Sequence, residues 1–232
     1  MELKEARTLI CGATGVLGGQ LAVALDAEGA RVALAGRNES RLKELSATLD
    51  DAPTFVLDAV DQDSCDQAVD DAAAALGGLD LLVVTVGVAA FGPAMEADPA
   101  VTEELFAVNT LGPMGLVRAA GPHFGDSGTV VVLSAILADV PTAQMAEYSA
   151  SKSALATWLQ VLQREQRRRL TVIDVRPPHL DTELDTRAIA GTPPRLPEPY
   201  PAADVVDAVL RAIREDAKAV TYDGEAKALR VN

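Results

Sequence analysis

The chain has 232 residues, of which 49% are hydrophobic and 3% aromatic, and its formal net charge is −14. This length suits one domain with a single large core, and the aliphatic composition favours helices packed on a parallel sheet over an all-β sandwich. The negative charge disfavours nucleic acid as a partner. Cys11 and Cys65 have no metal-ligand spacing, so neither a disulfide framework nor a metal site is expected. Because no leader and no bilayer-spanning apolar run is visible, we expect a cytoplasmic protein without membrane contact.

Apolar runs of strand length alternate with segments of helical composition along the whole chain. The expected strands are residues 8–11, 31–35, 54–57, 80–85, 129–134, 171–175 and 219–222. The expected helices are residues 20–28, 40–49, 61–76, 102–120, 149–168 and 203–215. The acidic residues 61–64 are interpreted as a helix start. This alternation predicts a single α/β domain over residues 1–232, a Rossmann-type doubly wound parallel sheet of about seven strands.

A glycine-rich loop joins the first expected strand to the first expected helix. Its glycines are Gly12, Gly15 and Gly18, and the loop reads Gly-Ala-Thr-Gly-Val-Leu-Gly from residue 12. At such a junction the backbone can approach a pyrophosphate and present helix N-terminal amides to it. A plain strand-to-helix turn is the alternative. The position of the loop predicts that a dinucleotide contacts the loop residues Gly12, Thr14, Gly15, Val16, Leu17 and Gly18.

The end of the second expected strand favours a phosphorylated ribose. An Asp or Glu there would hold the free ribose of NAD, but the chain reads Ala35-Gly36-Arg37-Asn38. Arg37, helped by Ser40 or Arg41, can instead donate charge-assisted hydrogen bonds to a 2′-phosphate. NADP is therefore the expected cofactor and NAD the less favoured one, although Arg37 can also be read as a solvated arginine at a helix start.

Tyr148 and Lys152 stand four residues apart on an expected helix. Residues with this spacing share one helix face, and a nearby ammonium stabilises a phenolate, which lets the phenol exchange a proton at neutral pH. The alternative is a surface Tyr and Lys that merely share a helix.

Taken together, the glycine loop, the Tyr-x-x-x-Lys pair and the distance between them resemble the short-chain dehydrogenase/reductase family over essentially the whole chain. The resemblance implies that Tyr148 is the acid/base, that Lys152 also binds the nicotinamide ribose, and that Asn109 organises a proton relay to the lysine. It further implies that the cofactor site includes Asp58, Gly87, Pro177 and Thr182.

The chain departs from the usual pattern of the family, which marks it as an atypical member. The glycine spacing looks like that of extended or atypical members, and Val84-Thr85-Val86-Gly87 stands where Asn-Asn-Ala-Gly is usual. The family's substrate-binding serine aligns with Ala135, whereas the neighbouring serine is Ser134. Adjacent strand residues point to opposite faces, so Ser134 serves as the catalytic serine only if the following turn is one residue shorter. Both possibilities stay open, with Ser134 kept among the candidate catalytic residues.

The segment 181–201 is rich in Pro and Thr and has no periodicity, so it is the expected substrate loop. With the apolar run 88–91, it predicts a small, apolar substrate with a carbonyl or secondary alcohol, reduced or oxidised by hydride transfer. The alternative is a catalytically silent dinucleotide-binding regulator or partner subunit. Leu155, Trp158, Leu159 and Leu162 form an apolar helix face that, in the resembled family, packs against another subunit. A homodimer or homotetramer is therefore expected, with intrachain core as the alternative.

Overall fold

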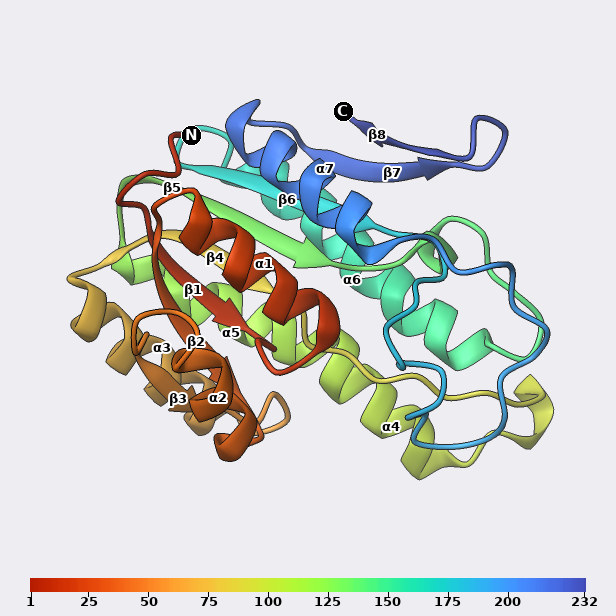
Figure 1. Ribbon diagram of the computed structural model, residues 1–232. Helices are drawn as coiled ribbons and strands as arrows, with labels where there is room; N and C mark the ends of the chain where they lie inside the picture. Colours follow the sequence, from red (N-terminus) through yellow and green to blue (C-terminus); the bar gives the residue numbers. More distant parts are fainter.

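A computed structural model describes residues 1–232 as one eight-stranded sheet with helices on both faces (Figure 1). The strands are β1 (Arg7–Cys11), β2 (Arg31–Gly36), β3 (Thr54–Val56), β4 (Leu79–Val84), β5 (Phe124–Leu133), β6 (Leu170–Arg176), β7 (Ala219–Asp223) and β8 (Ala228–Val231). The helices are α1 (Val16–Ala27), α2 (Glu39–Ser46), α3 (Gln62–Leu76), α4 (Pro99–Phe106), α5 (Gly112–Ala120), α6 (Ala146–Glu165) and α7 (Ala202–Arg214).

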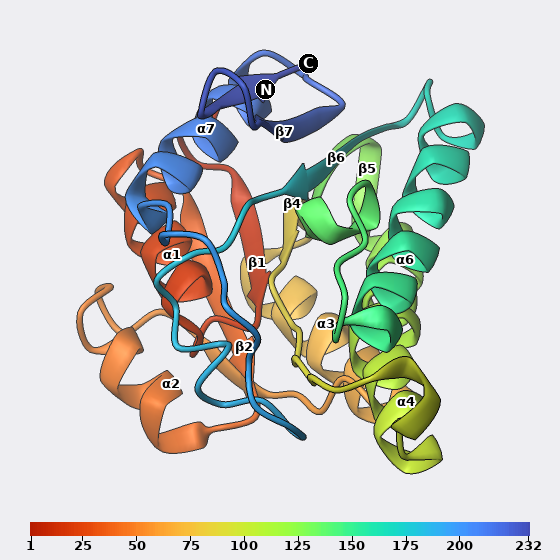
Figure 2. The same cartoon turned by 90° about the vertical axis from the view of Figure 1, so that its right-hand side faces the viewer.

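The strand order β3-β2-β1-β4-β5-β6-β7-β8 confirms the predicted doubly wound sheet. All neighbouring strands are parallel except β7 and β8, which are antiparallel. The order reverses between β1 and β4, so the carboxyl ends of these two strands border the crevice where such sheets bind ligands. Figure 2 looks onto this carboxyl edge.

Buried side chains alternate between the two faces of each central strand. Ile10 of β1 packs with α1 and α7 residues, whereas Leu9 and Cys11 pack with residues of α3 and α5. Such strands are apolar on both faces and need helices on both sides. At the start of α3 the Asp61 side chain accepts hydrogen bonds from the amides of Asp63 and Ser64, which confirms that the acidic run begins a helix.

Three expectations about the elements need correction. The sheet has an eighth strand, β8, because Asp223 accepts hydrogen bonds from the Glu225 and Ala226 amides and closes a tight turn back onto β7. The expected helix 102–120 is divided by a π-helical turn, Ala107–Leu111. Pro113 lacks the N–H that would bond to the Asn109 carbonyl four residues earlier, so a regular α-helix cannot continue there. Leu155 and Leu159 belong to the intrachain core, since both are fully buried.

Candidate functional site

The glycine loop lies between β1 and α1 and leaves no room for a side chain at Gly12 or Gly18. Gly12 has φ +92°, and a Cβ there would lie 2.6 Å from Thr85 Oγ1 and 2.9 Å from the Val86 amide nitrogen. A Cβ on Gly18 would overlap the Gly12 carbonyl, and Gly15 is the N-cap of α1. The backbone amides at the start of α1 are therefore open to an anion.

A cleft of about 740 Å³ begins at this loop and runs along the carboxyl ends of β1, β2, β3 and β4. Of the residues predicted to bind the cofactor, it is lined by Gly12, Thr14, Gly15, Arg37, Asp58 and Gly87. The other predicted cofactor residues do not line it: Val16, Leu17, Gly18, Lys152, Pro177 and Thr182. Leu17 lies in the core beneath α1, so its side chain is not available to a ligand.

The cleft also contains Arg41, the expected helper of Arg37, and residues not assigned to the cofactor: Gly36, Asn38, Glu39, Leu57, Ala59, Thr85, Val86, Val88, Val108, Leu184 and Arg187. Gly36 and Asn38 are neighbours of Arg37, and Leu57 and Ala59 are neighbours of Asp58. Their position next to a predicted residue at a strand end would have identified them. Leu184 and Arg187 belong to the expected substrate loop 181–201, but nothing in the sequence singles out these two residues within it.

The end of β2 presents Arg37 to the cleft as an exposed side chain without an ion-pair partner. Asn38 caps α2 by accepting a hydrogen bond from the Arg41 amide at 3.0 Å, which orders the turn that carries both arginines. Glu39, the nearest carboxylate along the chain, is paired with Lys43 at 2.7 Å. This turn can therefore bind an anionic group.

Tyr148 and Lys152 lie one turn apart on α6, and both are almost completely buried. Burial raises the pKa of Tyr148 to about 12. Burial also lowers the pKa of Lys152 to about 8, against the opposing effect of the Asp174 carboxylate. The Tyr148 hydroxyl makes no hydrogen bond within the chain, whereas Lys152 Nζ donates to the Leu133 carbonyl at 3.1 Å. The phenol is therefore free for a ligand.

The Asn109 side chain forms hydrogen bonds both with the segment that follows β4 and with α6. Its side chain accepts a hydrogen bond from the Val88 amide and donates to the Val88 carbonyl and to Ser151 Oγ, at 2.9, 3.0 and 3.1 Å. A Cβ on Gly87 would lie 3.3 Å from Asn109 Oδ1 and 3.4 Å from Lys152 Nζ. The structure thus brings Asn109, Gly87 and Lys152 together.

Ser134, the remaining candidate catalytic residue, has its hydrogen-bond partners outside this group. Its hydroxyl donates to the carboxylate of Asp174, a buried residue of β6 that also accepts from Arg176 Nε at 2.7 Å. Ala135 packs in the apolar cluster that contains Tyr148. Of these two adjacent residues, Ala135 therefore lies towards Tyr148 and Ser134 towards Asp174.

The segment between β6 and α7 crosses the carboxyl edge of the sheet in front of β1 and β2 (Figure 2). Its base is closed by a bridge between Leu180 and Tyr200, and its middle is held by a 2.8 Å hydrogen bond from the Ile189 amide to the Ala89 carbonyl. A Cβ on Gly191 would overlap the Phe91 carbonyl. Side chains of this segment pack on the Tyr148 cluster, namely Leu184, Ala188, Ile189, Ala190 and Leu196. The surroundings of the phenol are therefore apolar.

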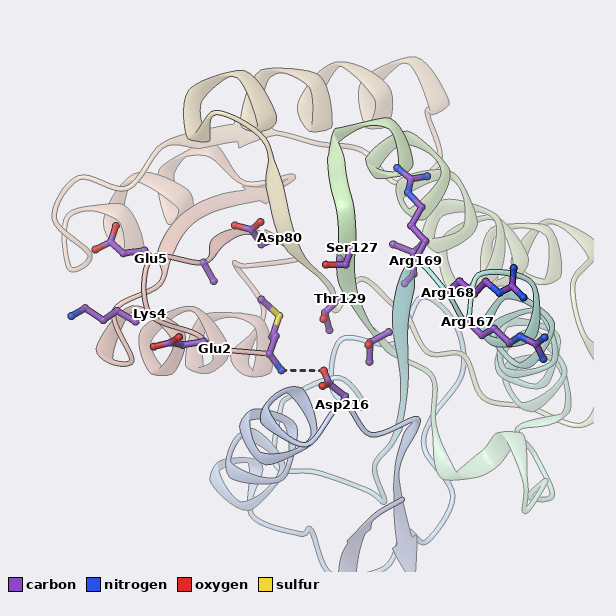
Figure 3. A pocket seen from close by; sticks show the side chains of 15 residues that line it. Glu2, Lys4, Glu5, Asp80, Ser127, Thr129, Arg167, Arg168, Arg169 and Asp216 are labelled. Carbon is purple, nitrogen blue, oxygen red and sulfur yellow. Dashed lines mark hydrogen bonds and ion pairs between the residues drawn. The ribbon is translucent and has the colours of Figure 1, made fainter.

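A second cleft, of about 540 Å³, lies at the opposite, amino edge of the sheet (Figure 3). Three of the eight charged side chains that line it have partners within the chain. Asp80 pairs with Arg7, Asp216 with the amino terminus, and Arg169 donates to the Gly121 and Phe124 carbonyls. Ligands of open α/β sheets bind at the carboxyl edge, so the cleft with the glycine loop is the candidate site.

None of the helices combines the length and the apolar composition needed to cross a membrane.

Comparisons with known proteins agree with this geometry. Residues 6–192 match the short chain dehydrogenase family. Dehydrogenase/reductase SDR family member 7B of Xenopus tropicalis is 27% identical over 99% of this chain and 81% of its own length. Versicolorin reductase of Emericella nidulans is 29% identical over 76% of this chain and 69% of its own.

A solved structure points the same way. A Burkholderia cenocepacia short chain dehydrogenase, crystallised in complex with NADP, has a TM-score of 0.84 and 28% identity, covering 97% of this chain and 98% of that one. The glycine loop, the Tyr148–Lys152 pair and these matches show that the chain belongs to the short-chain dehydrogenase/reductase family and is an NAD(P)-dependent oxidoreductase.

Proposed function

We propose that the protein uses NADP(H) in preference to NAD(H) to interconvert a carbonyl and a secondary alcohol on a small, apolar substrate. The observation that carries the cofactor preference is Arg37, an unpaired guanidinium at the end of β2 where no carboxylate is available for a free ribose. Gly12, Thr14 and Gly15 would hold the diphosphate through the start of α1, and Asp58 lies in the same cleft. The related structure in complex with NADP supports this choice.

Each site residue has a distinct role in the proposed reaction. When bound, the nicotinamide supplies or accepts the hydride. Tyr148 holds the proton that is exchanged with the substrate oxygen, and Lys152 stabilises the phenolate that forms. Asn109 holds the end of β4 against α6 beside Lys152. The apolar cluster around Tyr148 excludes water and favours an apolar substrate. Pro177 and Thr182 are proposed to border the nicotinamide.

The cofactor preference is tested by titrating the protein with NADPH and NADH. We expect NADPH to bind at least about tenfold more tightly, since a charge-assisted contact to phosphate contributes about 1.5–3 kcal/mol. Arg37→Asp should abolish or reverse the preference, because it removes the donor and repels the 2′-phosphate. Equal Kd values for the two cofactors in the wild type would contradict the proposal.

The position of the missing serine gives a second test, with a panel of apolar carbonyl substrates and NADPH. Ser134→Ala should leave kcat/KM within about twofold, since its hydroxyl serves Asp174. Ala135→Ser adds a hydroxyl within the Tyr148 cluster and should raise kcat/KM, by an amount up to the roughly hundredfold that an oxyanion donor supplies. A large loss in Ser134→Ala at unchanged thermal stability would contradict this assignment.

A catalytically silent regulator or partner subunit is the second candidate, favoured by Ala135 in the place of a polar donor. Tight NADPH binding without turnover of any carbonyl or alcohol would favour it.

We also propose a homodimer or homotetramer. Val161, on the outer side of α6, is 45% exposed and would form part of such an interface. Analytical ultracentrifugation tests this.

A further inference from the structure

Arg187 lies in the cofactor cleft, although it belongs to a segment of the chain that follows the sixth strand. Among the residues that line the cleft, only Arg187 and Leu184 come from beyond β6. The other lining cations are Arg37 and Arg41, which both belong to the turn after β2. The part of the cleft formed by Gly12, Thr14 and Gly15 has no cation of its own.

The guanidinium of Arg187 has no strong partner within the chain. Its side chain is 47% exposed, and its nearest carboxylate, Glu183, lies at 3.8 Å and is itself 65% exposed. Its hydrogen bonds to the carbonyls of Glu183 and Thr182 are both 3.5 Å long, at the outer limit for such bonds. Arg176 differs, since it holds two carboxylates at 2.6 and 2.7 Å. Arg187 can therefore turn to an incoming anion at little cost.

The backbone that follows Arg187 pairs with the segment that follows Gly87, another residue of the cleft. Two residues further on, the Ile189 amide bonds to the Ala89 carbonyl, and Phe91 donates to Ala190 at 3.0 Å. Residues 89–91 follow Gly87, which lies beside Lys152 Nζ. A dinucleotide that runs from Arg37 towards Lys152 would pass the start of α1 with its diphosphate between these ends.

Electrostatics favours a cation at this place. A chain with a net charge of −14 repels a polyanionic cofactor, so local positive potential must offset that repulsion. The start of α1 supplies only a partial charge through its amides. A guanidinium can add two parallel hydrogen bonds to phosphate oxygens.

We propose that Arg187 binds the diphosphate of the cofactor and so holds the segment 181–199 over Tyr148. The inference rests on the proposed function, because it assumes that a dinucleotide occupies the cleft. Leu184, Ile189 and Leu196 of the same segment pack on the Tyr148 cluster, so the contact would couple cofactor binding to closure of the substrate site.

The test measures binding of NADPH, NADH, ADP and 2′-AMP to the wild type, Arg187→Ala and Arg187→Lys. Arg195→Ala is the matched control, since Arg195 is an exposed arginine of the same segment that does not line the cleft. We expect Arg187→Ala to raise the Kd of NADPH, NADH and ADP by about tenfold, the lower end for a charge-assisted hydrogen bond at a half-exposed site. 2′-AMP binding should not change, Arg187→Lys should lie between the two, and Arg195→Ala should match the wild type. NADPH should also slow hydrogen exchange of the Ile189 amide less in Arg187→Ala than in the wild type.

Three other results would contradict either the Arg187 contact or the proposed function. A loss confined to NADPH and 2′-AMP would assign Arg187 to the 2′-phosphate and overturn the diphosphate contact. Equal Kd values in Arg187→Ala, Arg195→Ala and the wild type would overturn the inference while leaving the proposed function intact. A wild type that binds neither dinucleotide would overturn the proposed function, and the inference with it.

Discussion

Tyr148→Phe is expected to lower kcat by about 10²–10⁴-fold, the range that positioned proton transfer supplies, with the Kd for NADPH within about twofold. The phenol is buried in an apolar cluster, and its hydroxyl forms no hydrogen bond within the chain. Its removal therefore takes away the proton donor without leaving an unpaired group behind, and thermal stability should not fall. Steady-state kinetics, cofactor titration and thermal melting measure the three quantities separately.

Tyr222→Phe is the matched control, because Tyr222 lies on β7, packs edge-on against Tyr200 and is outside the Tyr148 cluster. It should keep the wild-type kcat. A Tyr148→Phe variant with wild-type turnover on a confirmed substrate would show that another group exchanges the proton.

Lys152→Met should abolish most turnover and weaken cofactor binding, yet make the fold more stable. Burial lowers the pKa of Lys152 from 10.5 to about 8, so the folded chain holds this ammonium less readily than the unfolded chain does. Below pH 8 the full cost of burying the charge is present, up to roughly 3 kcal/mol at 1.36 kcal/mol per pKa unit. Methionine has a similar length and carries no charge. Asp174 keeps Ser134 and Arg176 as partners when the ammonium is removed.

The sign of the pH dependence follows from the same shift. Between about pH 8 and pH 10.5 the unfolded chain binds more protons at this residue than the folded chain does, so the contribution of Lys152 to the unfolding free energy rises with pH. The stability advantage of Lys152→Met over the wild type should therefore be largest below pH 8 and disappear towards pH 10.5. Denaturant unfolding at several pH values measures it, with the exposed Lys218→Met as control.

Turnover of the wild type should fall as the pH rises through about 8, because a neutral Lys152 no longer stabilises the phenolate.

The stability prediction has its own contradicting outcome. A Lys152→Met variant that is less stable than the wild type at pH 7 would show that the ammonium contributes more through its contacts than its burial costs.

Much of the fold is determined by the sequence locally. The apolar runs predict seven of the strands, because each strand buried on two faces needs a continuous apolar segment. The strand β8 escapes prediction, since residues 228–231 acquire their strand partner only when the turn after Asp223 brings them back to β7. Pro113 indicates that the helix is interrupted, but only the structure shows that the interruption is a π-helical turn and that Asn109 lies in it.

For the site, the sequence by itself determined the parts whose chemistry depends on near neighbours: the glycine loop at the start of α1, Arg37 in its turn, and Tyr148 with Lys152 on one helix face. The tertiary structure decided what depends on distant partners. The Ser134 hydroxyl donates a hydrogen bond to Asp174, 40 residues away in sequence. Arg187 enters a cleft whose other walls are built mainly from residues before 109. The sequence predicts a substrate loop at 181–201, but it singles out neither the Asp174 contact of Ser134 nor Arg187 within that loop, because both depend on strands and loops that become neighbours only when the sheet assembles.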